Sequence, residues 1–107
     1  MKDVNILVER KNNDFAEVHI SGKLSVHYSQ HIYHEIKKIA ASYSHLVIKL
    51  IDIEEFDLAI FQIFYALKLQ YESENKKVEF ISKLNSELQV IFTNAGLENL
   101  DTILSIN

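Results

Sequence analysis

Residues 45–51, HLVIKLI, constrain the fold of this chain more than any other stretch. The run is rich in β-branched side chains and almost continuously apolar. This pattern is typical of a central strand that is covered on at least one face. A buried strand of this kind requires neighbouring strands and a layer of helices, so the patterns on either side of it decide the architecture.

The stretches that precede the run predict a hairpin and then a helix. Residues 4–10, VNILVER, and 15–20, FAEVHI, alternate as strands do, and the turn-rich tetrapeptide KNND separates them. After SGKLS, Ser25 is placed to cap a helix that continues to about residue 43. Its apolar positions recur at helical spacing: Ser29, Ile32, Ile36, Ile39, Ala40 and Tyr43.

The stretches that follow predict two more helices and another strand. Asp57 opens a helix that extends to about Ser73, and KKVEFI, 76–81, has the composition of a strand. NSELQVIFTNAG, 85–96, predicts a third helix, with Ser86 and Gln89 as a capping box and Gly96 as its stop. Residues 97–106 fit either a short edge strand or a docked tail. The order predicts the α/β class: a mixed sheet of four or five strands with an N-terminal antiparallel hairpin, and three or four helices.

Composition limits the organisation and the function. The 107 residues contain no repeat and no linker-like segment, so we expect one domain spanning 1–107. The net charge is -4, there is one arginine, and no basic cluster exceeds a pair, which argues against a nucleic-acid partner. There is no cysteine, no run long enough for membrane insertion and no signal-peptide pattern, so we expect a cytoplasmic protein.

Catalytic motifs are missing as well. The chain has only two glycines, no phosphate-cradling loop and no nucleophile elbow. We therefore expect no enzyme activity and no cofactor.

The helix that begins after Asp57 has more apolar surface than one core can use. At 100° per residue, Ile60, Ile63, Phe64, Leu67 and Tyr71 form a normal core-facing stripe. Leu58, Phe61, Tyr65 and Leu69 fall on the opposite arc, beside the polar Gln62. We interpret this arc as an interface for a partner protein or a second copy of the chain. The alternative is that another segment of the same domain, such as 97–107, covers it.

Two clusters of titratable residues have a functional and a simpler interpretation. Glu54, Glu55 and Asp57 form either a solvated acidic turn, with Asp57 capping the amide of Ala59 or Ile60, or an acidic rim that steers a basic partner. His27, His31 and His34 are spaced i, i+4, i+7 and would share one helix face, which permits a zinc site. Solvated surface is the simpler reading of these histidines, because they point away from the predicted core.

Three motifs resemble STAS domains, the anti-sigma-factor-antagonist family. ISGKLS resembles that family's strand, glycine and helix-cap entry. LVIKLIDIEEFDLAI resembles its central strand and the Asp-Ser-Ser-Gly-like turn that follows, and VEFISKLNSELQVIFTNAGLENL resembles its closing strand, helix and Gly-Leu ending. The resemblance runs from about Val4 to Leu104.

The resemblance implies a small, non-enzymatic binding module in bacterial signalling or transcription regulation. Its partner would be an anti-sigma factor or a related kinase, and contact would be made through Asp57, Leu58, Ala59, Phe61, Gln62 and Tyr65. The family's phosphorylated hydroxyl corresponds to Ala59, which cannot accept a phosphate, so no phosphorylation is expected there. A second possibility is an accessory subunit that binds the ATPase of an ABC-type lipid transporter, and a third is a metal-binding or sensing domain built on the three histidines.

Overall fold

The computed structural model describes residues 3–82, which form four strands and two α-helices. In chain order the elements are β1 (Val4–Arg10), β2 (Phe15–Leu24), the 3₁₀ turn η1 (Val26–Tyr28), α1 (Ser29–Ala40), β3 (His45–Phe56), α2 (Leu58–Ser73) and β4 (Lys77–Ser82). The predicted third helix and the tail at 97–107 lie outside the described residues.

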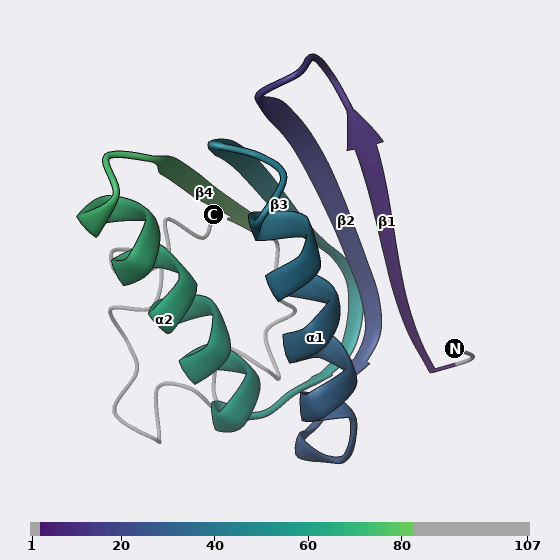
Figure 1. Ribbon diagram of the computed structural model, residues 1–107. Coiled ribbons are helices and arrows are strands. Elements are labelled where there is room, and N and C mark those ends of the chain that lie inside the picture. Colours follow the sequence, from purple (N-terminus) through teal and green to yellow (C-terminus); the bar gives the residue numbers. More distant parts are fainter. Residues whose placement is uncertain (1–2, 83–107) are drawn as a thin grey trace.

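The four strands form one mixed sheet in the order β1-β2-β3-β4. β1 and β2 are antiparallel, whereas β2 with β3 and β3 with β4 are parallel. Each parallel pair is joined by a crossover through a helix, and both helices lie on the same face of the sheet (Figure 1). The α/β class and the N-terminal antiparallel hairpin predicted from the sequence are therefore confirmed.

Strand periodicity and the helical stripes meet in a core between the sheet and the two helices. In β2 the alternation of side chains buries Ala16, Val18 and Ile20, and in β3 it buries Leu46, Ile48 and Leu50. The helices contribute Ile32, Ile36 and Ile39 from α1 and Ile60, Phe64, Leu67 and Tyr71 from α2. The two stripes therefore contact the core at the positions that their spacing predicts.

Tyr71 ties the two helices together at the end of α2. Its side chain is 1% exposed, and its hydroxyl donates to the carbonyl oxygens of Ala40 at 3.1 Å and Tyr43 at 2.6 Å. Those carbonyls belong to the C-terminal end of α1 and the residues after it, where helix carbonyls lack partners within the helix. Burial, with the nearby charge of Glu74, raises the pKa of Tyr71 to about 12.

β2 and β3 both extend further than the sequence predicts. Gly22 lies beyond the end of the strand predicted over 15–20, but it is inside β2 and has a φ of 102°. A Cβ at this position would lie 2.1 Å from the carbonyl oxygen of Asp3, so only glycine fits. The pairing with β3 shifts register on both sides of Gly22, and Asp52 of β3 takes a φ of 51°. These irregularities allow the pairing to continue to Phe56, where an acidic turn was expected.

Candidate interaction surface at the start of α2

Asp57 fixes the start of α2 through contacts with a distant part of the chain. Its amide donates to the carbonyl of Leu24 at 2.9 Å, and its Oδ2 accepts from the amide of Val26 at 2.7 Å. The carbonyl of Asp57 accepts from the amides of Ile60 and Phe61. The start of α2 is thereby attached to the junction between β2 and η1.

The expectation that the Asp57 side chain caps the first turn of α2 is wrong. Asp57 does precede the helix in an extended conformation, but it makes no side-chain hydrogen bond to the first turn. The carboxylate accepts from the amide of Val26 instead, because the C-terminal ends of the paired strands β2 and β3 lie side by side. Ser25 similarly precedes η1 without a side-chain cap, and its carbonyl accepts from the amide of Tyr28.

The outward side of α2 is only partly as predicted. Leu58, Tyr65 and Leu69 are 49%, 40% and 49% exposed, and Gln62 is also exposed. Phe61 was expected among them, but it is 5% exposed and belongs to the core.

The error at Phe61 has a geometric cause. This residue lies about 90° from the centre of the buried stripe, where a ring as large as phenylalanine still reaches the core. It stacks on Tyr65, with ring centroids 6.1 Å apart and an interplanar angle of 22°. Phe61 is therefore buried in the core, with its ring stacked beside that of the exposed Tyr65.

Val26 is a member of this surface that sequence reasoning missed. It is 61% exposed, and its amide is bonded to the carboxylate of Asp57, which directly precedes Leu58. An isolated valine after a serine carries no signal of its own in the sequence. Only the pairing of β2 with β3 brings it to the start of α2.

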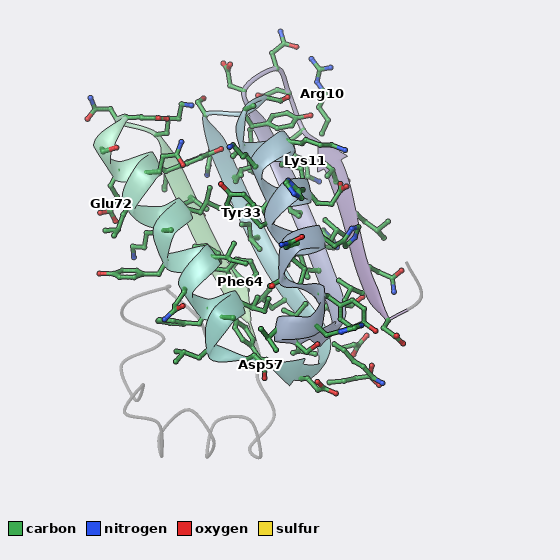
Figure 2. All side chains as sticks on the ribbon, turned by 60° about the horizontal axis from the view of Figure 1, so that its bottom comes forward. Arg10, Lys11, Tyr33, Asp57, Phe64 and Glu72 are labelled. Atoms are coloured by element: carbon green, nitrogen blue, oxygen red, sulfur yellow. The ribbon has the colours of Figure 1, made fainter. Side chains whose placement is uncertain are left out.

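The acidic residues before α2 lie on the last part of β3. Glu54 and Glu55 are exposed strand residues, not members of a turn, and Asp57 is half-buried. Beside them, the hydroxyl of Tyr28 donates to Asp3 Oδ2 at 2.5 Å, and this bond raises the pKa of Tyr28. The end of β3 next to Leu58 thus carries the carboxylates of Glu54, Glu55 and Asp57. Figure 2 shows Asp57 at this end of the sheet.

A groove of about 550 Å³ separates α1 from α2. Small residues leave this space open: Ala40 on α1, and Ala59 and Ala66 on α2. Tyr33, Ile36 and Ile63 contribute larger side chains to its walls. Ala59 and Gln62, at the start of α2, therefore also line the groove. The contribution of α1 to this surface was not predicted.

The three histidines considered for a metal site do not lie on one helix. His27 belongs to the 3₁₀ turn, whereas His31 and His34 belong to α1. The rings of His27 and His34 make edge contacts with Tyr28 and Tyr33. The spacing argument for zinc assumed a continuous α-helix from residue 26, and that assumption is wrong.

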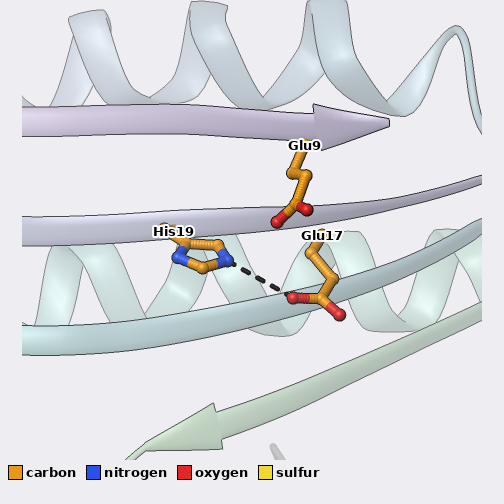
Figure 3. Close-up of side chains that lie close together, drawn as sticks. All are labelled: Glu9, Glu17 and His19. Carbon is orange, nitrogen blue, oxygen red and sulfur yellow. Dashed lines mark hydrogen bonds and ion pairs between the residues drawn. The ribbon is translucent and has the colours of Figure 1, made fainter. Parts of the chain in front are cut away.

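Within residues 3–82, the residues whose ligand atoms come close enough to share a metal ion are Glu9, Glu17 and His19 (Figure 3). Lysines neutralise both carboxylates. Lys11 lies 2.9 Å from Glu9, and Lys49 lies 3.1 Å from Glu17. The hydrogen bond from Lys49 lowers the pKa of Glu17. An ion-pair network on the sheet face opposite the helices accounts for this cluster.

None of the helices in the described part of the chain has the length and apolar character needed to span a membrane.

Three solved structures resemble this chain along most of its length. An anti-sigma factor antagonist from Mycobacterium paratuberculosis is 20% identical with a TM-score of 0.73, over 96% of this chain and 84% of that one. The anti-sigma factor antagonist SpoIIAA in its unphosphorylated form is 12% identical with a TM-score of 0.67, over 96% and 99%. The phosphorylated form of SpoIIAA from Bacillus is 11% identical with a TM-score of 0.64, over 90% and 87%.

The fold is that of the anti-sigma factor antagonists. This STAS-like fold confirms what the motif resemblance implied about architecture. At the level of sequence, no family model matches the chain, and no curated protein matches it. The likeness is therefore one of fold, at sequence identities of 11% to 20%.

Proposed function

We propose that this protein is a non-enzymatic interaction module that binds a partner protein through the start of α2, as an antagonist-like adaptor in bacterial regulation. The contact would be made by Leu58, Gln62 and Tyr65, with Val26 beside them. The main support is the exposure of Leu58 and Tyr65 in a fold shared with anti-sigma factor antagonists. Phe61, first expected in the contact, would act by holding Tyr65 in position.

The energetics favour a small apolar contact with a charged border. Complete burial of a leucine or an aromatic side chain is worth about 1.5 to 3 kcal/mol, so covering the exposed halves of Leu58 and Tyr65 contributes roughly 1 kcal/mol each. The carboxylates of Glu54 and Glu55 lie on the adjacent strand end. They would raise the association rate of a partner with a basic surface and disfavour an acidic one.

The adaptor would be constitutive, without control by phosphorylation at this site. SpoIIAA has a phosphorylated form, whereas the corresponding position here, from the motif resemblance, is Ala59. Ala59 lies in the first turn of α2, where it is half-buried and lines the interhelical groove. Its side chain has no hydroxyl that could accept a phosphate. The same feature is compatible with the ATPase-binding subunit of a transporter. The identity of the captured partner distinguishes these two roles. An anti-sigma factor or kinase would indicate the regulatory adaptor, and an ABC ATPase would indicate the transporter subunit.

Affinity capture with a matched pair of variants tests the proposal. The double variant Leu58→Glu, Tyr65→Glu places two charges in the surface, and we expect it to lose the partner that the wild-type protein retains. Ile81→Glu is the control, because Ile81 is 40% exposed, as Tyr65 is, but lies on β4. With the purified partner, we expect the dissociation constant to rise by about a hundredfold or more for the double variant.

The substituted side chains are about half-buried, so we expect both variants to remain folded but to lose about 1 kcal/mol of stability for each substitution. A double variant that folds normally and retains every partner would refute the proposed surface.

A further inference from the structure

β1 forms an edge of the sheet, and its first five residues lack the usual protection of an edge strand. Within residues 3–82, no strand pairs with its outer side. Val4–Val8 contains no charge, no proline and no bulge, which are the features that normally prevent an edge from pairing. Leu7 is 68% exposed, more than any other exposed large apolar side chain of the described residues, and Val8 is 46% exposed.

The hydrogen bonds of the hairpin show which backbone groups of β1 face outward. The carbonyl of Asp3 accepts from the amide of Lys23, and the amide of Lys11 donates to the carbonyl of Phe15. Because antiparallel pairs alternate and the register is unbroken, the odd-numbered residues of β1 bond to β2. The amides and carbonyls of the even-numbered residues Val4, Ile6, Val8 and Arg10 therefore point toward the free edge.

We propose that β1 pairs with β1 of a second copy of this chain, antiparallel and centred on Leu7, so that one sheet continues through a two-fold dimer. In this register Val4 lies opposite Arg10, Ile6 opposite Val8, and Leu7 opposite its own counterpart. All outward-facing backbone groups of both strands then find partners. Leu7 falls at a non-hydrogen-bonded position, where facing side chains come closest.

Charge and packing select this register over its neighbours. Antiparallel pairing places Asp3 at the beginning of one strand beside Lys11 at the end of the other. A shift of two residues in one direction would set Asp3 opposite Glu9, and like charges facing each other destabilise a sheet. A shift in the other direction would set Leu7 opposite Glu9 and leave Val4 without a partner strand. The centred register avoids both penalties, and Leu7, the side chain that it brings together at the dyad, is already exposed.

The dimer would leave the proposed partner surface accessible. α2 packs against β4, at the opposite end of the sheet from β1 (Figure 1). A dimer joined through β1 would thus present two copies of Leu58 and Tyr65 at its two ends, and a bivalent adaptor gains avidity toward an oligomeric partner. The inference does not depend on the proposed function, since self-association is measured on the purified protein alone.

A cross-linking experiment tests the register directly. The chain has no cysteine, so Leu7→Cys introduces a single thiol. At a non-hydrogen-bonded pair the Cα atoms are about 4.5 Å apart, within the range of a disulfide. Val8→Cys is the matched control, because the counterpart of Val8 is Ile6, and the two introduced thiols would be diagonal, at about 7 to 8 Å. In a glutathione buffer we expect Leu7→Cys to form the covalent dimer at least about tenfold faster than Val8→Cys.

Sedimentation of the wild-type protein and of Leu7→Lys provides the second measurement. We expect the wild-type mass to rise from 12.4 kDa toward twice that value as the concentration increases from micromolar to millimolar. Leu7→Lys places two ammonium groups at the dyad, and we expect its dimer dissociation constant to be about tenfold higher or more. Leu69→Lys, on α2, should self-associate as the wild-type protein does.

Three results would each overturn the inference. One is a wild-type mass that stays at 12.4 kDa over the whole concentration range. This result would overturn the inference even if a different protein, when added, were found to bind the β1 edge. Another is equal cross-linking of the two cysteine variants. The third is a folded Leu7→Lys variant that dimerises as strongly as the wild-type protein.

Discussion

Removal of the Tyr71 hydroxyl should lower the free energy of unfolding by weakening the contact between α1 and α2, without changing the shape of the core. Tyr71→Phe keeps the buried ring but deprives the carbonyls of Ala40 and Tyr43 of their donor. A hydrogen bond contributes about 0.5 to 1.5 kcal/mol, and a carbonyl that loses its donor costs more only where water cannot replace the donor. Because the contacts with Ala40 and Tyr43 are part-buried, we expect the variant to be less stable by about 1 to 2 kcal/mol at neutral pH, with a melting temperature lower by roughly 4 to 8 °C per kcal/mol.

The pH dependence gives the same prediction a second readout. The pKa of Tyr71 is about 12 in the folded protein, against 10.0 ordinarily, because burial disfavours the phenolate. A raised pKa in the folded state stabilises the protein below pH 10, and this contribution is lost as the pH rises through 12. A shift of about two units corresponds to at most about 2.7 kcal/mol. The stability gap between wild type and Tyr71→Phe should therefore narrow between pH 10 and 12.

Chemical denaturation of both proteins from about pH 7 to 12 measures this gap. Taking the difference between the proteins cancels the titration of lysines and of the other tyrosines. Tyr65→Phe is the control on the same helix: Tyr65 is 40% exposed, and its variant should stay within about 0.5 kcal/mol of wild type. Equal stability of wild type and Tyr71→Phe at neutral pH, or a gap that stays constant up to pH 12, would refute the reasoning.

Three further substitutions probe other contacts. Gly22→Ala should destabilise the fold by more than about 1 kcal/mol in thermal melts, because its Cβ would collide with the Asp3 carbonyl at a positive φ; a melt like that of wild type would contradict the close approach. Glu17→Gln should remove a contribution to folding stability that is present above the ordinary carboxyl pKa and is lost as the pH falls, since the hydrogen bond from Lys49 lowers the pKa of Glu17. Denaturation of the variant and the wild-type protein at about pH 7 and pH 3 measures this contribution, and an equal loss of stability at both pH values would contradict it. Phe61→Ala should cost about 3 to 5 kcal/mol, as for other buried phenylalanines, and a loss below about 1 kcal/mol would mean that the ring is not in the core.

Much of the fold could be predicted because local periodicity reports directly on burial. The alternation in FAEVHI and the spacing of Ile32, Ile36 and Ile39 identify the faces that contact the core. The order of these patterns then imposes parallel crossovers. The length of β3 could not be predicted in this way. Its nearly continuous apolar run ends at Ile51, and the residues after it pair with β2 only through a register shift beside Gly22 and a positive φ at Asp52.

The candidate site was predicted less completely, because its geometry depends on contacts across the sequence. Leu58 and Tyr65 were identified from the helical arc, and their exposure follows from α2 alone. Val26 was not identified, since the pairing of β2 with β3 brings it beside Asp57, and neither residue signals the bond between them locally. Phe61 was assigned to the wrong environment because a helical wheel gives direction but not the reach of a side chain.

The bond between Asp57 and Val26 has a consequence for the thermodynamics of recognition. It joins two segments that are 31 residues apart and holds them in place before any partner arrives. A binding protein that contacts both segments loses little conformational entropy in ordering them, so most of the contact energy remains available as affinity. The bond thus pre-arranges the helix start, and we expect its complexes to form with few structural rearrangements of this chain.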